Sequence, residues 1–205
     1  MRFAIVSLLF VACGHVTAVR PVEHHIIAAE LAVGGPAVLL GSVPVPLPLS
    51  TLGARYGFAE RWDVGAHAHL TTLYYKVAGF DIDADWLALP QIGRIPALTL
   101  GARVYAFTDF RSGMTNDADL SATASWLFGR WLSYATMTVQ RDFLDRRFSW
   151  ATAIGEQILW TRWSAQAELR WFDPGYDVTN SAPHWLSAGR GAFGMVLGIG
   201  YRFGG

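Results

Sequence analysis

The sequence is short of charge, of lysine and of cysteine, and each shortage excludes a class of protein. Charged residues make up 16% of the 205 residues, whereas a soluble domain usually carries about a quarter. Lys76 is the only lysine and the formal net charge is zero, so the basic patch of a nucleic-acid-binding protein is missing. Cys13 is the only cysteine, which excludes an intramolecular disulfide and a cysteine-based zinc site.

Long apolar runs are also missing after the N-terminus, although hydrophobic residues make up 52% of the chain. A membrane-spanning helix needs about 20 consecutive apolar residues, so helical spans are not expected. The apolar residues instead alternate with polar ones. Only a closed sheet can present such a pattern to lipid, because an open sheet edge would leave backbone groups without hydrogen bonds.

The alternation is clearest in residues 192–203. One parity is apolar throughout, and the other is mostly small or charged; the first holds Phe193, Met195, Leu197, Ile199, Tyr201 and Phe203, and the second Gly194, Val196, Gly198, Gly200 and Arg202. Side chains alternate across a strand with period two. An apolar outer face with a small, polar inner face is typical of a transmembrane barrel strand.

Ten segments of strand length share this pattern. They are residues 24–33, 49–58, 62–75, 79–89, 97–109, 118–128, 131–142, 147–159, 163–172 and 192–203. Every second connection is short, and the others are more variable, as in an outer-membrane barrel with short turns at one end and loops at the other. The eighth segment is irregular, because Glu156 shares a parity with Ile154 and Ile158. We expect a bulge or a register shift there.

Aromatic residues gather near both ends of these segments. Trp62, Trp126, Trp131, Trp160, Trp163 and Tyr201 lie by the short turns, and Tyr74, Tyr75, Phe107, Phe110, Phe143, Phe148 and Trp171 lie toward the loops. Rings with a polar atom prefer the headgroup region of a bilayer, so the two groups predict aromatic belts at the two membrane interfaces.

With these features, the chain resembles a small bacterial outer-membrane β-barrel over residues 24–203, and Gly198-x-x-Tyr201-x-Phe203 resembles the C-terminal assembly signal of that class. The resemblance implies an all-β, antiparallel, up-and-down barrel of about ten strands, with eight or twelve as alternatives. It also implies the outer membrane of a Gram-negative bacterium as the location, periplasmic termini, and the barrel-assembly machinery and outer-membrane lipid as partners. Gly204 and Gly205 depart from the signal, which usually ends on the aromatic residue.

A soluble, lipocalin-like barrel would invert the two faces. It would expose to water a face with too few charges for a normal soluble surface. It would also leave the aromatic belts without a role, so the membrane barrel is the favoured interpretation.

The first residues have the composition of a targeting segment, with Arg2 ahead of an apolar run from Phe3 to Ala12. Two processing hypotheses stay open. Cleavage after Ala18 would remove a signal peptide of residues 1–18. Alternatively, residues 10–13 resemble a lipobox, so that residues 1–12 would be a lipoprotein signal and Cys13 the lipidated mature N-terminus.

The inner parity predicts a polar network in the lumen. Its expected members are Glu30, Arg55, Asp63, His67, His69, Asp83, Asp85, Arg103, Glu168, Arg170 and Arg202, with Asp81, Asp109 and Gln166 on the same face. Buried charges must be paired, and a ten-stranded barrel is narrow. We therefore expect internal salt bridges that plug the lumen, including a pair between Glu30 and Arg202 on the first and last strands.

His67 and His69 are the sharpest candidates for a specific site. Residues i and i+2 of a strand share a face about 7 Å apart, so both rings could reach one metal ion, with Asp83 and Asp85 of a neighbouring strand completing the ligands or orienting an imidazole. Histidines in a polar network are common, however, so the sequence assigns no metal, no cofactor and no catalytic residue.

Three functions stay open: a structural or binding protein at the cell surface, a small channel or transporter, and a barrel hydrolase acting on lipid or peptide. The polar residues that a hydrolase could use near the outer rim are Asp81, Asp109, Asp142 and His184. Their spacing matches none of the patterns of omptin proteases, lipid A deacylases or lipid A acyltransferases. Two long loops, residues 34–48 and 173–191, could carry binding residues. The oligomeric state is not indicated.

Overall fold

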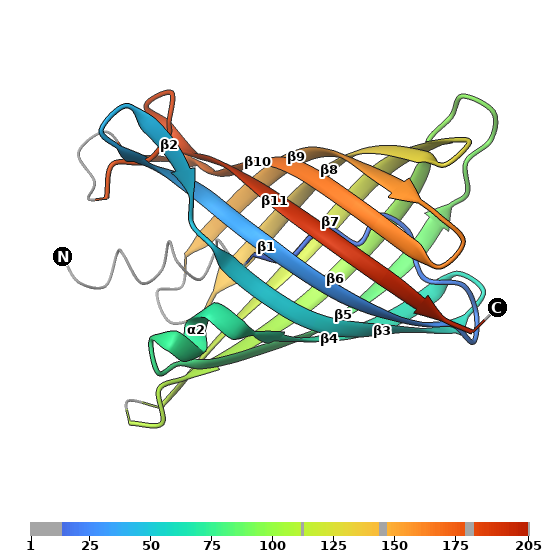
Figure 1. Cartoon of the computed structure of the whole chain (residues 1–205), viewed down its shortest axis with the longest axis horizontal. Helices are drawn as coiled ribbons and strands as arrows, with labels where there is room; N and C mark the ends of the chain where they lie inside the picture. The colour runs from blue at the N-terminus through green and yellow to red at the C-terminus, as the bar shows by residue number, and fades with distance from the viewer. Residues whose placement is uncertain (1–13, 112, 144–146, 179–182, 205) are drawn as a thin grey trace.

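The computed structural model describes residues 14–111, 113–143, 147–178 and 183–204. It is a closed barrel of ten antiparallel strands (Figure 1). The strands of the wall are β1 (Ile27–Leu40), β3 (Leu49–Ala59), β4 (Trp62–His69), β5 (Ala78–Leu89), β6 (Ala97–Thr108), β7 (Met114–Phe128), β8 (Trp131–Asp142), β9 (Phe148–Leu159), β10 (Trp163–Asp177) and β11 (Arg190–Phe203). A further strand, β2 (Val43–Pro46), pairs with the end of β1 outside the wall.

Each wall strand pairs with the next in sequence, and β11 pairs with β1 to close the barrel. The closing pair runs from Ile27 opposite Phe203 to Pro36 opposite Gly194. The prediction of an up-and-down barrel with an even number of strands is thus confirmed, and the number is ten. Closure leaves no unpaired sheet edge in the wall.

The two faces of the wall have opposite chemistry. In β4 every second residue is buried, and the buried side chains include Asp63, His67 and His69. The exposed parity of the wall is apolar, as with Ile82 at 62% exposure and Leu120 at 67%. The wall therefore presents hydrocarbon outward and charge inward. This is the arrangement of a membrane barrel and the opposite of a soluble lipocalin-like barrel.

Residues 34–48, which the sequence predicted as a long loop, form the end of β1 and the edge strand β2. β1 continues to Leu40 and turns into β2, which pairs with it from Ala37–Pro46 to Leu40–Val43. Gly34 has a φ of 143°, where β1 leaves its pairing with β3. The prolines of β2 are tolerated because this strand lies at an edge and pairs on one side.

The segment 62–75 was predicted as one strand, but β4 ends at His69. The five residues of α2 (Leu70–Tyr74) follow, and Lys76 with a φ of 61° ends the turn before β5. The Thr72 hydroxyl donates to the His69 carbonyl at 2.8 Å, which favours the turn over continued extension. In the part of the chain that the structure describes, no helix is long and apolar enough to cross a membrane.

The irregularity expected around Glu156 is not found. β9 pairs in continuous register with β8 and with β10, and Glu156 lies opposite Ser133 and Ala167. Its side chain is exposed on the outer parity with Ile154. The sheet therefore keeps its register and places one carboxylate on the apolar face, a few residues from the turn that follows β9.

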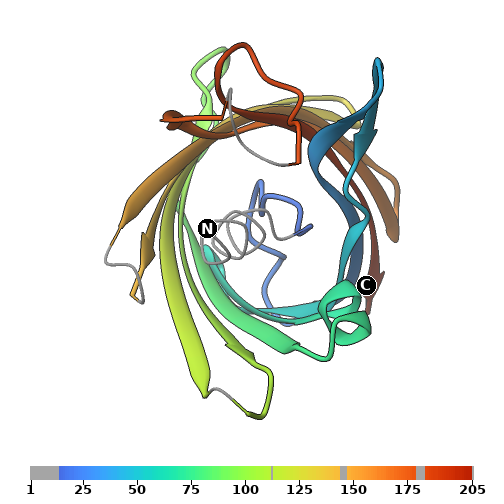
Figure 2. The same ribbon diagram turned by 90° about the vertical axis from the view of Figure 1, so that its left-hand side faces the viewer.

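The chain enters the wall from inside. Residues 14–23 lie within the ring of strands before the chain reaches β1 (Figure 2). This stretch, which we call the N-terminal segment, contacts the inner face through buried residues such as Val19. The barrel thus encloses part of its own chain.

Candidate functional site

The lumen holds three linked groups of polar contacts, two between side chains of the wall and one made by the N-terminal segment. Arg55 of β3 is at the centre of the first. Its guanidinium contacts Asp63 of β4 at 2.7 Å, Asp83 of β5 at 2.6 Å, and Asp85. Arg55 is 2% exposed. One cation thus holds three buried carboxylates, a geometry that its planar fork of donors permits.

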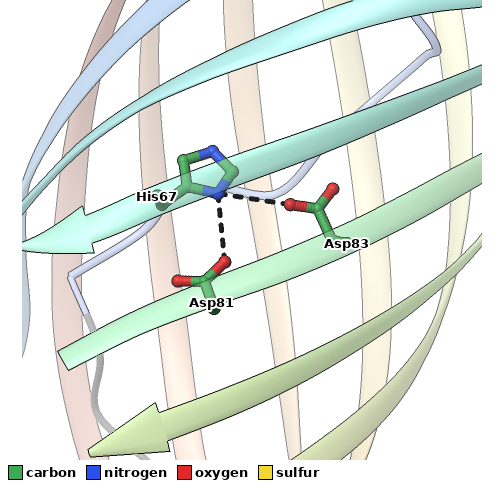
Figure 3. Close-up of side chains that lie close together, drawn as sticks. All are labelled: His67, Asp81 and Asp83. Carbon is green, nitrogen blue, oxygen red and sulfur yellow. Dashed lines mark hydrogen bonds and ion pairs between the residues drawn. The ribbon is translucent and has the colours of Figure 1, made fainter.

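His67 extends from β4 toward Asp81 and Asp83 of β5 (Figure 3), and His69 of the same strand also reaches Asp81. Nδ1 of His67 lies 3.0 Å from Oδ1 of Asp81 and 3.2 Å from Oδ1 of Asp83. Nε2 of His69 lies 2.8 Å from the other oxygen of Asp81. Adjacent register positions on β4 and β5 make this meeting possible, because His67 is directly opposite Asp81.

The expected ligand set therefore changes in one respect. The structure brings His67 together with Asp81 and Asp83, whose ligand atoms all lie within 4.8 Å of one another. Asp85 points to Arg55 instead, and His69 reaches only the far oxygen of Asp81. The antiparallel register explains the difference, since Asp85 lies opposite Asp63, four register pairs away from the His67–Asp81 pair.

Arg103 of β6 continues the network toward β7. It lies 3.6 Å from Asp81 and 3.5 Å from Asp83, and it is opposite Asp119 in the sheet. The Tyr105 hydroxyl donates a short hydrogen bond to Asp119. Sequence reasoning left Asp119 out of the network, although it shares the inner parity of Ser121, Thr123 and Ser125.

Glu168 and Arg170 of β10 form the second group on another part of the wall. Arg170 donates to Glu168, and the hydroxyl of Tyr134 on β8 donates to Glu168 at 2.8 Å. Gln166 donates to the Tyr134 oxygen at 2.7 Å. Glu168 is 1% exposed, so these donors replace the water that its carboxylate would otherwise bind.

The N-terminal segment is the third group, and it joins strands on different sides of the barrel. Its hydrogen bonds to the wall use mainly its own backbone. Thr17 N–H donates to Glu168 at 3.2 Å and Val22 N–H to Asp63 at 2.8 Å. Gln166 donates to the Thr17 carbonyl at 2.9 Å, and Thr99 to the Val19 carbonyl at 2.9 Å.

Side chains of the segment add to these contacts. Arg20 donates to Ser125 at 3.0 Å and to Gln91 at 2.7 Å. Val19 packs against Leu132 and Tyr134. No sequence motif predicted that this segment lies inside the barrel. Backbone groups make most of its polar contacts, and every residue has such groups.

The residues of the proposed assembly signal lie on both faces of β11, the outer face and the face toward the lumen. Tyr201 and Phe203 lie on the outer parity, with ring centroids 4.8 Å apart, and Trp163 lies 4.7 Å from Tyr201. Gly198 faces the lumen, where a Cβ would come within 2.6 Å of Val16. The glycine therefore makes room for the N-terminal segment. Cys13, the lipidation candidate, lies outside the described residues.

Two expectations about individual side chains are wrong. Arg202 pairs with Glu23 at 2.7 Å rather than with Glu30, because Glu30 sits opposite Gly200 in the register and reaches His67. Phe107 does not belong to the loop-side belt: it is 2% exposed and packs inside, with its centroid 4.9 Å from the ring of His69.

The rim candidates for a hydrolase are dispersed. Asp81 is 1% exposed within the wall network, whereas Asp109 accepts a hydrogen bond from the Arg111 backbone in a turn at 2.9 Å. His184 uses its carbonyl to accept from Leu39 N–H at 2.7 Å. Asp142 ends β8.

At the loop end, the last loop packs against the β1–β2 hairpin. Leu186 N–H donates to the Ala37 carbonyl at 2.7 Å. Val38, Val178, Trp185 and Ala192 form a buried apolar cluster there, and Leu47 and Tyr176 cover it. We call these two loops and their cluster the cap.

No protein-family model matches the sequence, and no curated protein matches it. Among solved structures, the barrel is similar to the translocator domain of the autotransporter NalP from Neisseria meningitidis, at 12% identity over 98% of this chain and 94% of that one, with a TM-score of 0.43. An outer membrane channel from Pseudomonas putida F1 has 8% identity over 92% and 99% of the two chains, with a TM-score of 0.48. The outer membrane protease OmpT from Escherichia coli has 10% identity over 87% and 97%, with a TM-score of 0.45.

With identities of 8–12% and TM-scores below 0.5, these similarities assign neither a family nor an activity to the chain. The closed ten-stranded wall, apolar outside and charged inside, is the more direct observation. The chain has the architecture of a small bacterial outer-membrane β-barrel protein.

Proposed function

We propose that the protein is an outer-membrane barrel whose lumen is closed by its own N-terminal segment and internal salt bridges, and that it has a structural or binding role at the cell surface. The observation that carries the proposal is the set of hydrogen bonds from the segment to the wall. They reach β4, β6, β7 and β10.

Small and larger spaces adjoin different parts of the segment. Two cavities between the segment and the wall hold about 30 and 20 Å³, roughly one water molecule each. A wider space of about 310 Å³ lies at the turn end, lined by residues that include Val19, Leu132 and Arg202. Solute passage would require the segment to leave and its hydrogen bonds to break.

The cap supports a binding role rather than transport. Its backbone hydrogen bonds and buried cluster join described residues of the hairpin and of the last loop, and loops carried by a rigid scaffold are a common place for binding residues. In this proposal the cap faces outward, and the turn end, with both barrel termini, faces the periplasm.

A truncation series tests whether the segment closes the lumen. Chains beginning at Gly14, Val19 and Glu23 would be refolded into detergent and inserted into planar bilayers. We expect the chain from Gly14 to be silent and the chain from Glu23 to show steady conductance, with the chain from Val19 between them. Equal conductance for all three lengths would contradict the proposal.

The orientation is tested separately, by single cysteines on intact cells. Tyr74 in the loop after β4 is 84% exposed, and Ile92 in the turn after β5 is 67% exposed. A membrane-impermeant maleimide should label Tyr74→Cys on intact cells and Ile92→Cys only after lysis. The reverse pattern would show that the cap faces the periplasm.

A further inference from the structure

Three buried side chains direct one ligand atom each toward a common point in the lumen. Nδ1 of His67 lies 3.0 Å from Asp81 Oδ1 and 3.2 Å from Asp83 Oδ1 (Figure 3). Zinc bonds of about 2.0–2.1 Å in a tetrahedral site place neighbouring ligand atoms roughly 3.3 Å apart. The two separations in the lumen are therefore close to those of a ligand set around one ion.

The remaining polar atom of each of these residues is held by an outer partner. Nε2 of His67 lies 3.4 Å from Glu30. Oδ2 of Asp81 lies 2.8 Å from His69, and Oδ2 of Asp83 lies 2.6 Å from Arg55. Metal-binding histidines and carboxylates are oriented in this way, with the second atom of each ligand bound to a neighbouring group.

Asp83 gives a second, independent indication of a ligand. Its side chain is 3% exposed, and within the described residues its Oδ1 accepts no hydrogen bond. A buried carboxylate oxygen without a hydrogen bond is costly. This oxygen is one of the three atoms at the common point, where its contacts are ion pairs with His67 Nδ1 at 3.2 Å and with Arg103 at 3.5 Å. A bound cation would give it a direct ligand bond in place of these longer contacts.

The charges around the point also favour a cation. Among the described residues, the linked ion pairs join five carboxylates to two guanidinium groups and two imidazoles; the carboxylates are Glu30, Asp63, Asp81, Asp83 and Asp85, and their partners are Arg55, Arg103, His67 and His69. A histidine that binds a metal is neutral, and with both imidazoles neutral the carboxylates outnumber the guanidinium groups by three. Negative charge buried in excess is unfavourable. A divalent cation would reduce that excess at its centre.

Two glycines make room for the imidazole. A Cβ at residue 53 would come within 1.9 Å of the His67 ring, and a Cβ at residue 65 within 2.7 Å of Asp83 Oδ1. The cavity of about 30 Å³ that is lined in part by Asp83 and Arg103 adjoins the same place. It is large enough for a water molecule, which could be a fourth ligand.

Arg103 is the competing cation. Its guanidinium lies 3.5–3.6 Å from the two carboxylate oxygens of the point, farther than a normal hydrogen bond. Nη1 of Arg103 has no hydrogen bond within the described part of the chain. Asp119 lies opposite Arg103 on β7, so a metal ion that displaced the guanidinium from the two aspartates would leave it a carboxylate on the next strand.

We propose that His67, Asp81 and Asp83 bind a divalent transition-metal ion of the zinc class, with Glu30 and His69 as positioning residues. A mixed nitrogen and oxygen donor set suits such an ion better than calcium or magnesium, which prefer oxygen ligands alone. The site lies within the wall of the lumen and does not depend on whether the N-terminal segment closes it.

The test uses the chain from Gly14, refolded with Co²⁺, desalted and analysed by visible absorption and metal content. His24 and His25 are exposed with stacked rings and could hold an ion of their own, so both are changed to Ala in every sample. We expect one equivalent of Co²⁺, displaced by Zn²⁺. His67→Ala and Asp83→Asn should each weaken binding by at least about 100-fold, and Glu30→Gln by about 10- to 100-fold.

Arg103→Gln should change the Co²⁺ affinity in the opposite direction, because removal of the competing positive charge should tighten binding of the ion. Heat-dependent gel mobility identifies the samples that have folded. If His67→Ala does not fold, the isosteric variant Asp83→Asn serves as the test of metal binding. Retention of as much Co²⁺ by Asp83→Asn as by its parent, or no retained ion in the parent, would overturn the proposal. Neither result would bear on the conductance of the truncation series.

Discussion

Two parts of the inner wall contain buried charge but satisfy it differently. On β3–β6, the carboxylates around Arg55 and His67 find most of their partners on neighbouring strands of the wall. On β8 and β10, Glu168 has the wall partners Tyr134 and Arg170, and it also accepts from the backbone of the N-terminal segment. The first part is mainly a property of the sheet, whereas the second depends on a chain inside it.

The largest effect should come from Arg55→Met, which breaks the first part. The change leaves Asp63, Asp83 and Asp85 buried without their shared cation. Removing one partner of a buried ion pair costs about 3–5 kcal/mol, and we expect at least this loss in the free energy of unfolding. Urea unfolding of vesicle-inserted protein, followed by tryptophan fluorescence, measures it. Arg202→Met is the matched control, because its partner Glu23 is 63% exposed, and it should change stability by under about 1 kcal/mol.

Glu168→Gln breaks the second part and should cost less. The amide keeps the shape but loses the charge that three donors share, a loss of about 1–3 kcal/mol. Part of that loss belongs to the segment, so it should shrink when the same change is made in the chain beginning at Glu23. A double-mutant cycle over the two unfolding free energies gives the coupling. Full additivity would show that the segment does not bind Glu168.

The smallest effect on stability should come from a charge on the outer face of the wall, in contrast to the charges of the inner face. Glu156 is the charged residue on the apolar parity of β9, near the turn end. Charges on the lipid-facing surface cost about 0–1 kcal/mol near the interface. Glu156→Leu should therefore stabilise the barrel slightly, in contrast to every loss of an inner charge. A destabilisation of more than about 1 kcal/mol would indicate that Glu156 has a partner outside the wall.

Sequence parity predicted the wall well and its local details less well. Period-two alternation placed His67, Asp83 and Arg103 on the inner face, because a one-residue shift would have moved each to the lipid side. It could not rank Asp81 above Asp85 as a partner of His67, since that depends on which residues the register sets opposite each other. The alternation also did not predict the turn of α2 after His69, because local side-chain-to-backbone hydrogen bonds compete there with an extended strand.

The N-terminal segment shows the limit of such patterns. One of the two processing hypotheses assigned residues 14–18 to a signal peptide, and no role was predicted for residues 19–23. The structure places residues 14–23 against the inner wall. The contacts use carbonyl and N–H groups, which carry no sequence signature. Gly198 is the residue of the sequence that comes closest to indicating this position. The resemblance assigns it to the assembly signal, and in the structure it faces Val16.

Amide hydrogen exchange within the segment is the most direct test of the closed lumen. Val22 N–H donates to the buried Asp63 at 2.8 Å, and residue 22 lies beyond both candidate processing sites. If the segment closes the lumen, this amide exchanges orders of magnitude more slowly in the folded chain in detergent than in the unfolded chain, and its exchange becomes faster in Asp63→Ala. Exchange at the unfolded rate in the folded protein would show that the segment does not occupy the lumen.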